Sequence, residues 1–302
     1  MTAVRSGWTH EFRCTVPDSR ERVFRALTEP SELRRWFAEH VDIDARQGGA
    51  FRFWGRHSYG APGRGSAPAR ITRFEPGRAF AFQWQFDGAD SEVVMELAPE
   101  AAKDAKDRTA RTRIELKHAF PAKPGLPYAA ELIDDLWRLT LGNLDAHLRG
   151  GEGIVLPDYT DPAPEIRLSL MVDASRERVF RALLEPEALN RWVASKAEVE
   201  PRIGGRYRYG WNYPIGDRQV EGGPACILDL VPNERLVTDW LDWRGDQTRP
   251  LTRVAWLLES VGGQTRVTII HGGFSRAADQ SDYPFGWRSF LEQLKSEAEA
   301  HS

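Results

Sequence analysis

The sequence predicts an α+β protein of two tandem domains, each with a curved antiparallel sheet around a long C-terminal helix. The 18-residue segment from Ser19 to Trp36 recurs from Ser175 to Trp192, with 14 of 18 positions identical and no gap. The two copies start 156 residues apart, about the length of one ordinary domain, which indicates a duplication. Each copy precedes a series of strand patterns and then one long amphipathic helical pattern, an order typical of the α+β class.

Composition restricts the class of protein. The chain has 302 residues, of which 41% are hydrophobic and 28% charged, with a net charge of −3. Because it contains no dense Lys/Arg block, we expect no nucleic-acid partner. Cys14 and Cys226 do not align in the repeat, so we expect free thiols in a reducing compartment. With no signal-like or membrane-spanning apolar run, the predicted location is cytoplasmic, without membrane insertion.

The repeat sets the predicted domain boundaries. Residues 1–152 form the first domain and residues 165–302 the second. Residues 153–164 read as a linker, because the segment around them is rich in Gly, Pro and acidic residues.

Each domain is expected to begin with a strand and two short helices. The first strand covers Phe12 to Val16, and Ser19 or Asp18 is placed to cap the following helix. Glu29-Pro30 ends that helix, since a residue before proline avoids the helical region. A second helix, 31–37, carries Trp36, and the same pattern ends at Trp192. We expect both tryptophans to anchor this helix to the sheet.

Strand patterns follow in both halves. Residues 48–54 and 204–211 alternate aromatic and basic residues, the period of a half-buried strand. A hairpin is expected over 69–86 and 225–243, joined by a tight turn. Two further strands are expected over 91–99 and 111–120, and over 253–260 and 265–274. The last helices are expected over 131–150 and 285–300, with Trp137 and Trp287 on their apolar faces.

These landmarks resemble those of a known superfamily. They are the phrases Arg22-Val23-Phe24 and Arg178-Val179-Phe180, Glu29-Pro30 and Glu185-Pro186, Trp36 and Trp192, the Gly-Gly pairs at 48 and 204, the turns at Pro76 and Pro232, and Gly286-Trp287. The pattern resembles the helix-grip (START, Bet v 1-like, SRPBCC) superfamily. Within it, the chain is similar to bacterial relatives of the C-terminal domain of the Hsp90 ATPase activator. This resemblance covers each half once and implies a cavity between the sheet and the C-terminal helix.

Two aligned histidines are candidate site residues. His118 and His271 each end an alternating face, and the alternation predicts that both point inward. Three roles stay open: a hydrogen-bonded core histidine, a polar anchor in a ligand cavity, or a general acid–base group. No carboxylate or nucleophile partner is fixed by spacing.

The predicted ligand-binding set contains the histidines and the inward-facing aromatic residues. Its members are Tyr207, Tyr209, Trp211, Trp240, Trp256, His271 and Trp287 in the second domain, and Phe53, Trp84, His118 and Trp137 in the first. The alternative is that these rings simply fill the core. We expect the second domain to hold the more functional cavity. It keeps the family landmarks more completely, and Thr238 and Asp242 replace Phe82 and Phe86 on the matching face.

The favoured function is non-catalytic binding of a small hydrophobic or aromatic molecule. The resemblance also allows a polyketide cyclase or dehydratase acting in the same cavity. A weaker alternative is a co-chaperone-like role with a protein partner, because the co-chaperone's additional N-terminal domain has no counterpart in the sequence. The histidines and cysteines lack metal-site spacing, and no nucleotide or nucleophile motif is present, so no metal, cofactor or catalytic residue is predicted.

Overall fold

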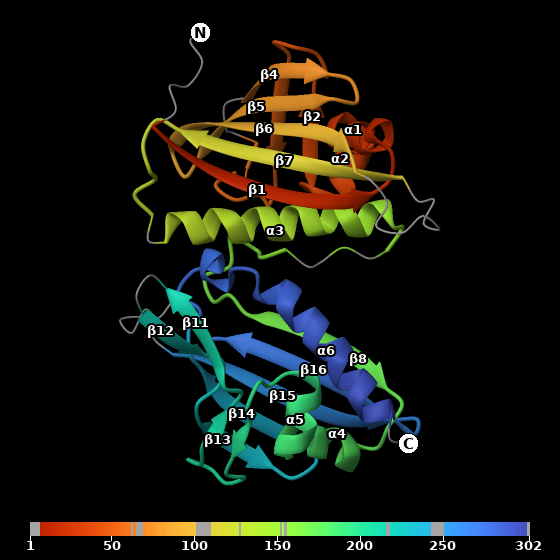
Figure 1. Cartoon of the computed structure of the whole chain (residues 1–302), viewed down its shortest axis with the longest axis vertical. Helices are drawn as coiled ribbons and strands as arrows, with labels where there is room; N and C mark the ends of the chain where they lie inside the picture. The colour runs from red at the N-terminus through yellow and green to blue at the C-terminus, as the bar shows by residue number, and fades with distance from the viewer. Residues whose placement is uncertain are drawn as a thin grey trace. The chain divides into compact units, whose positions relative to one another are not determined.

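The chain forms two compact units, Met1–Asp161 and Pro162–Ser302 (Figure 1). The computed structural model describes residues 7–61, 63–64, 69–100, 110–126, 128–151, 153, 156–215, 218–242 and 251–300. The boundary falls inside the predicted linker 153–164, and the part before it belongs to the first unit. There, the backbone N–H of Tyr159 donates to the carbonyl of Arg56 at 2.8 Å, and the rings of Tyr59 and Tyr159 meet edge to face.

The first unit contains a seven-stranded antiparallel sheet in the order β1-β7-β6-β5-β4-β3-β2. Its strands are β1 (Trp8–Pro17), β2 (His40–Ile43), β3 (Ala50–Trp54), β4 (Ala69–Glu75), β5 (Ala79–Phe86), β6 (Ala89–Pro99) and β7 (Arg111–Phe120). The sequence pattern missed β2, which pairs with β3 at the edge of the sheet. Alternate residues of β3 and β7 are buried, as expected for strands with one face on the core.

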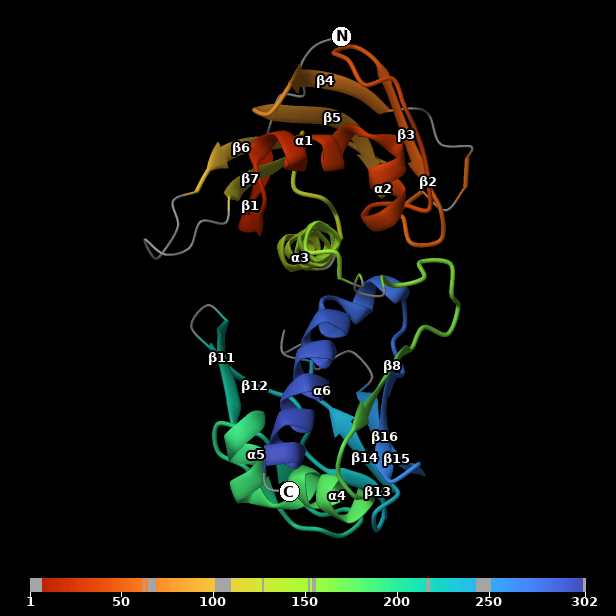
Figure 2. The same cartoon turned by 90° about the vertical axis from the view of Figure 1, so that its right-hand side faces the viewer.

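Three helices complete the first unit: α1 (Arg20–Thr28), α2 (Pro30–Trp36) and α3 (Ala129–Leu148). The Ser19 hydroxyl accepts a hydrogen bond from the Arg22 N–H, so the expected cap is present. Pro30 ends α1 and also begins α2, where its missing N–H costs nothing. Figure 2 shows α3 nearly end-on within the curve of the sheet, where it packs against β1 and α2.

The second unit repeats this order. Its five-stranded sheet runs β13-β14-β15-β16-β8, which corresponds to β4-β5-β6-β7-β1 of the first. The strands are β8 (Ile166–Val172), β13 (Ile227–Val231), β14 (Arg235–Trp240), β15 (Thr252–Val261) and β16 (Gln264–Gly272). The helices are α4 (Arg176–Leu184), α5 (Pro186–Trp192) and α6 (Tyr283–Ala300), with a short 3₁₀ helix over Ala277–Gln280. Helix α6 packs against β8, α4 and α5, so each domain surrounds its own C-terminal helix.

The prediction of one continuous strand over 204–211 was wrong. The structure has β10 (Tyr207–Arg208), paired with β9 (Glu198–Val199), and a separate β11 (Trp211–Ile215), paired with β12 (Arg218–Gly222). Gly210 lies between them with a φ of +71°, which is outside the strand region and favours glycine. The chain bends there because the Tyr209 carbonyl accepts hydrogen bonds from the N–H groups of Ser195 and Lys196.

The two predicted tryptophan anchors occupy equivalent positions. The indole N–H of Trp36 donates to the Ala26 carbonyl, and that of Trp192 donates to the Ala182 carbonyl, each at 3.0 Å. Each tryptophan is buried, and its hydrogen bond ties the second short helix of its domain to the first helix, whereas the sequence predicted an anchor to the sheet. None of the helices described is long and apolar enough to cross a membrane. Within the same described ranges, no cluster of three or more His, Cys, Asp or Glu residues is arranged to hold a metal ion.

Candidate functional site

A buried hydrogen-bond chain links helix and sheet in the first domain. The indole N–H of Trp137 on α3 donates to Nδ1 of His118 on β7 at 3.3 Å. That bond makes Nδ1 the acceptor, so Nε2 carries the proton and donates to the Ser91 hydroxyl at 2.9 Å. Ser91 in turn donates to the Trp84 carbonyl at 2.8 Å. Both ring nitrogens of His118 therefore have partners inside the protein.

The second domain builds the same chain from its own residues. Trp287 on α6 donates to Nδ1 of His271 at 3.0 Å, and Nε2 of His271 contacts the Thr252 hydroxyl at 2.8 Å. Thr252 lies 3.5 Å from the Trp240 carbonyl, a longer contact than its counterpart. Trp84 pairs with Ser91 across the first hairpin as Trp240 pairs with Thr252 across the second. The duplication has thus preserved the geometry with a different hydroxyl residue.

Burial holds both histidines neutral. Loss of hydration lowers the pKa of His118 to about 3, with a smaller contribution from the nearby His10. The same loss of hydration lowers the pKa of His271 to about 3. A histidine that is neutral near pH 7 and hydrogen-bonded at both nitrogens is poorly suited to take a proton from a substrate. Of the three roles left open by the sequence, this geometry favours the hydrogen-bonded core histidine.

The four candidates of the first domain lie in one continuous ring cluster. The Trp84 ring stacks on His118, with centroids 5.5 Å apart and planes 5° from parallel. Trp137 meets Trp84 edge to face at 6.1 Å, and Phe53 meets it at 5.4 Å. Side chains from α3, β7 and β3 thus meet the Trp84 ring on β5.

The candidates of the second domain also come together. Trp240 lies at the centre, 4.7 Å from Trp287, 5.5 Å from His271 and 5.9 Å from Trp211 between ring centroids. Tyr207, Tyr209 and Trp256 complete the set, and all but Trp211 are at most 3% exposed. The rings contact one another between the sheet and the helix. That these residues bind a ligand stays a prediction.

Two of these side chains also have a clear role in packing. The Tyr207 hydroxyl donates to the Leu183 carbonyl at 2.6 Å, and the Trp211 indole donates to the Val193 carbonyl at 2.9 Å. Each bond fixes the end of a short helix. Burial raises the pKa of Tyr207 and of Tyr209, so both phenols stay protonated.

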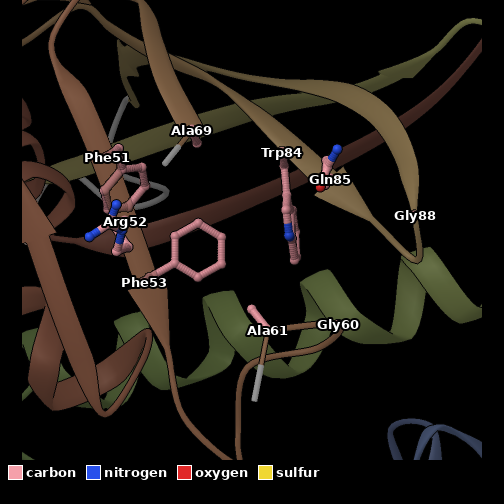
Figure 3. A pocket seen from close by; sticks show the side chains of 9 residues that line it. All are labelled: Phe51, Arg52, Phe53, Gly60, Ala61, Ala69, Trp84, Gln85 and Gly88. Carbon is pink, nitrogen blue, oxygen red and sulfur yellow. The ribbon is translucent and has the colours of Figure 1, made fainter. Parts of the chain in front are cut away.

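A cavity of about 210 Å³ lies in the first domain, against the ring cluster. Phe53 and Trp84 line it, while His118 and Trp137 lie behind Trp84 and outside the wall. Figure 3 shows the rings of Phe53 and Trp84, with Gly60 and Ala61 on the neighbouring loop. The wall combines β3, the loop after it, and the ends of β4 and β5. Its lining residues are Phe51, Arg52, Phe53, Gly60, Ala61, Ala69, Trp84, Gln85 and Gly88.

A more open groove of about 310 Å³ lies elsewhere in the first domain. It runs along the end of α2, from Arg34 to Glu39, and includes Asn143 on α3 with Gly153 and Leu156. Arg34 already donates to the Val41 carbonyl at 2.7 Å, and Glu39 pairs with Arg56. The groove contains none of the predicted site residues.

Sequence reasoning missed two kinds of site residue. Ser91 and Thr252 complete the histidine chains, and the signal was their position directly opposite Trp84 and Trp240 in each hairpin. Gly60 and Ala61 line the cavity from a loop whose sequence carries no repeat signal, because loop positions depend on the tertiary fold.

A comparison with protein families matches both halves of the chain. A family model described as "Activator of Hsp90 ATPase homolog 1-like protein" matches residues 18–148 and again residues 173–299. No curated protein matches the chain.

Several solved structures are similar to it. CalU16 from Micromonospora echinospora is 26% identical over 48% of this chain and 76% of its own, with a TM-score of 0.37. DynU16, described as a putative protein in the dynemicin biosynthetic locus, is 17% identical over 96% and 99%, with a TM-score of 0.40. The di-domain ARO/CYC BexL from the BE-7585A biosynthetic pathway is 17% identical over 97% and 99%, with a TM-score of 0.37.

Proposed function

Since the chain belongs to the Activator of Hsp90 ATPase homolog 1-like family, with one copy of the family domain in each half, we propose that it binds a small apolar or aromatic molecule. The observation that carries this proposal is the cavity beside Phe53 and Trp84. This cavity lies in the first domain; that the second domain holds the more functional cavity stays a prediction. The wall of this first-domain cavity combines the rings of Phe51, Phe53 and Trp84 with polar groups, and concave sites of rings and polar groups are a usual form of small-molecule site.

The volume of the cavity is a guide to the size of the ligand that fits inside it. An engineered apolar cavity of about 150 Å³ holds benzene, whereas drug-sized ligands occupy about 300–1,000 Å³. A volume of about 210 Å³ therefore suits a molecule of one or two rings. Burial of its apolar surface would contribute about 25 cal/mol per Å² before the costs of association.

Binding without catalysis is the role that the side-chain chemistry supports. His118 stacks on Trp84 and does not line the cavity. Both of its ring nitrogens are hydrogen-bonded within the protein, and its pKa is about 3. A cyclase or dehydratase acting here would need a proton-transfer group in contact with the ligand. Among the described lining residues, the polar side chains are Arg52 and Gln85, and neither is an ordinary general base at neutral pH.

A cavity-filling variant tests the proposal. Ala61 is buried in the cavity wall, so Ala61→Leu should occupy part of the ligand's volume. Ala50→Leu is the matched control, because Ala50 is exposed at the start of β3 and does not line the cavity. We expect ethylbenzene and naphthalene to shift the indole N–H resonance of Trp84 in the unmodified chain and in Ala50→Leu, but not in Ala61→Leu.

Two results would contradict the proposal. One is that neither hydrocarbon perturbs the cavity residues of the unmodified chain at its solubility limit. The other is that Ala61→Leu, with its fold intact by circular dichroism, binds both as tightly as Ala50→Leu does.

A further inference from the structure

The groove at the end of α2 brings charged and apolar side chains together on one open surface of the first domain. Its volume is about 310 Å³. Four of the residues that line it carry ionisable side chains, namely Arg34, Arg35, Glu39 and His57. The His57 ring donates through Nδ1 to the Pro157 carbonyl at 3.0 Å, which fixes the ring. What the groove can bind depends on which of the other three charges are already balanced within the protein.

The two arginines of the groove keep their positive charge. The Glu39 carboxylate is paired with Arg56, whose backbone N–H donates to it at 2.8 Å and whose guanidinium donates at 3.1 Å. Arg34 donates to the Val41 carbonyl at 2.7 Å, and a neutral carbonyl orients the guanidinium without cancelling its charge. Arg35 is exposed, and its side chain forms no ion pair or hydrogen bond within the described ranges of the chain.

The second domain shows what the same arginine does when an internal partner is present. Arg191 lies 156 residues after Arg35, at the matching position of the repeated segment. Its guanidinium pairs with Glu297 on α6, with Nε 3.0 Å and Nη2 2.6 Å from Oε1. Arginine near the end of a helix is favoured by the helix dipole in both domains. Of these two described side chains, however, only Arg191 is paired with a carboxylate.

A difference on the C-terminal helix explains why the first domain lacks this ion pair. The tryptophans of the two C-terminal helices align 150 residues apart, which places His147 where the second domain has Glu297. His147 pairs with Glu32 on α2, and Glu32 is also paired with Arg22 at 2.9 Å. Glu32 is therefore already engaged, and Arg35 is left facing the groove. A bound anion would supply the carboxylate that the second domain provides from its own helix.

Apolar side chains line the groove next to this arginine. Trp36, Phe37 and Ala38 follow it along the chain, and Leu156 comes from the segment after α3. A ligand whose carboxylate pairs with Arg35 would therefore place an apolar body against these side chains. The volume lies at the lower end of the range of about 300–1,000 Å³ for sites of drug-sized molecules.

We infer that the groove at the end of α2 is a second binding site, which takes an amphipathic carboxylic acid, and that Arg35 recognises its carboxylate. The planar guanidinium matches a carboxylate in two parallel hydrogen bonds, so Arg35 acts as the specificity-determining residue. The site is separate from the cavity of the proposed function, because the two share no lining residue.

A charged probe and a neutral probe of the same shape test the inference. 2-Naphthoate and 2-naphthamide have nearly the same outline, but only 2-naphthoate is an anion at pH 7. We expect the affinity of the whole chain for 2-naphthoate to fall about fivefold in Arg35→Gln, the effect of one solvent-exposed ion pair. The affinity for 2-naphthamide should stay the same. Arg25→Gln is the matched control, since Arg25 is exposed in the last turn of α1 and does not line the groove.

NMR of the whole chain shows where each probe binds. In the groove, 2-naphthoate should shift the backbone amide of Ala38 and the Nε–H resonance of Arg35, which Arg35→Gln identifies by its loss. Binding in the cavity would instead shift the Trp84 indole resonance and would be weakened by Ala61→Leu. Circular dichroism of Arg35→Gln checks that the fold is intact.

The outcomes separate this inference from the proposed function. A loss of 2-naphthoate affinity confined to Arg35→Gln, together with shifts at Ala38, supports the inference. It is overturned if Arg35→Gln and Arg25→Gln bind 2-naphthoate equally, or if 2-naphthoate at its solubility limit leaves Ala38 unperturbed. Either of these results leaves the proposed function standing, because ethylbenzene and naphthalene test that function at Trp84.

Discussion

Lowering the pH from 7 to 4 should destabilise each domain through its buried histidine. His118 and His271 have pKa values of about 3 in the folded chain, because burial disfavours the charged ring. In the unfolded chain their pKa returns to the ordinary value of about 6.5. As the pH falls between these values, the unfolded state binds one more proton per domain than the folded state. The stabilisation is therefore complete above about pH 6.5 and is lost progressively towards pH 3.

The magnitude follows from the two pKa values. One pKa unit corresponds to about 1.4 kcal/mol, so each domain should lose about 2 kcal/mol of unfolding free energy between pH 6.5 and pH 5. By pH 4 the loss reaches about 3–4 kcal/mol per domain. That is a large part of a typical total of about 5–15 kcal/mol.

Urea titrations of the whole chain at several pH values measure this effect. The indole N–H resonances of Trp137 and Trp287 report the first and second domain separately, since each lies in the core of its own unit. His118→Gln and His271→Gln keep an amide donor and cannot become charged in this range. Each variant should be less stable than the parent chain at pH 7, but it should lose less stability on acidification, and only in its own domain.

The result depends on how steeply the free energy of unfolding changes with pH in the parent chain and in each variant. Carboxylates contribute to acid unfolding in the parent and in both variants alike, so the difference between the chains isolates the histidine. Equal dependence on pH from 6.5 to 4 in the parent and the variants would refute the assignment of a neutral, internally hydrogen-bonded histidine.

Two further predictions concern stability in the second domain. Trp192→Ala should lower the free energy of unfolding by about 3–5 kcal/mol, because it removes a buried ring and the hydrogen bond to the Ala182 carbonyl. Urea titrations followed by the Trp287 resonance measure the loss, and an unchanged midpoint would contradict it. Gly210→Ala should lower the thermal stability of the second domain more than Gly204→Ala does, although both glycines have φ above +70°. The added methyl group would lie 2.7 Å from the Lys196 carbonyl oxygen at position 210 and would meet nothing within 4 Å at position 204. Equal thermal midpoints for these two variants would exclude the predicted clash.

The duplicated segment and the patterns that follow it were sufficient to predict much of the fold. Local sequence signals predicted these features of the fold. They are Ser19 as a cap, Pro30 as a helix boundary, and the alternation along β7 and β16 that points His118 and His271 inward. Each of these signals depends on a few neighbouring residues, so it can be recognised without knowledge of distant contacts. The family match in both halves confirms the tandem architecture that they predicted.

Other features were decided only by contacts between distant parts of the chain. The partners of the histidines, Ser91 and Thr252, are 27 and 19 residues away and become neighbours through strand pairing. Gly210 breaks an aromatic alternation that looks continuous in sequence, because Ser195 and Lys196 bond to the carbonyl before it.

The position of the cavity likewise could not be predicted from the sequence. The sequence placed aromatic residues on the inner face of both domains but could not distinguish a filled core from a lined space. In the second domain the candidate rings pack against one another. In the first domain the loop with Gly60 and Ala61 helps to form a cavity beside Trp84 and Phe53. Alternation along a strand decides which face a side chain occupies, whereas the space left beside it depends on the packing of every element around it.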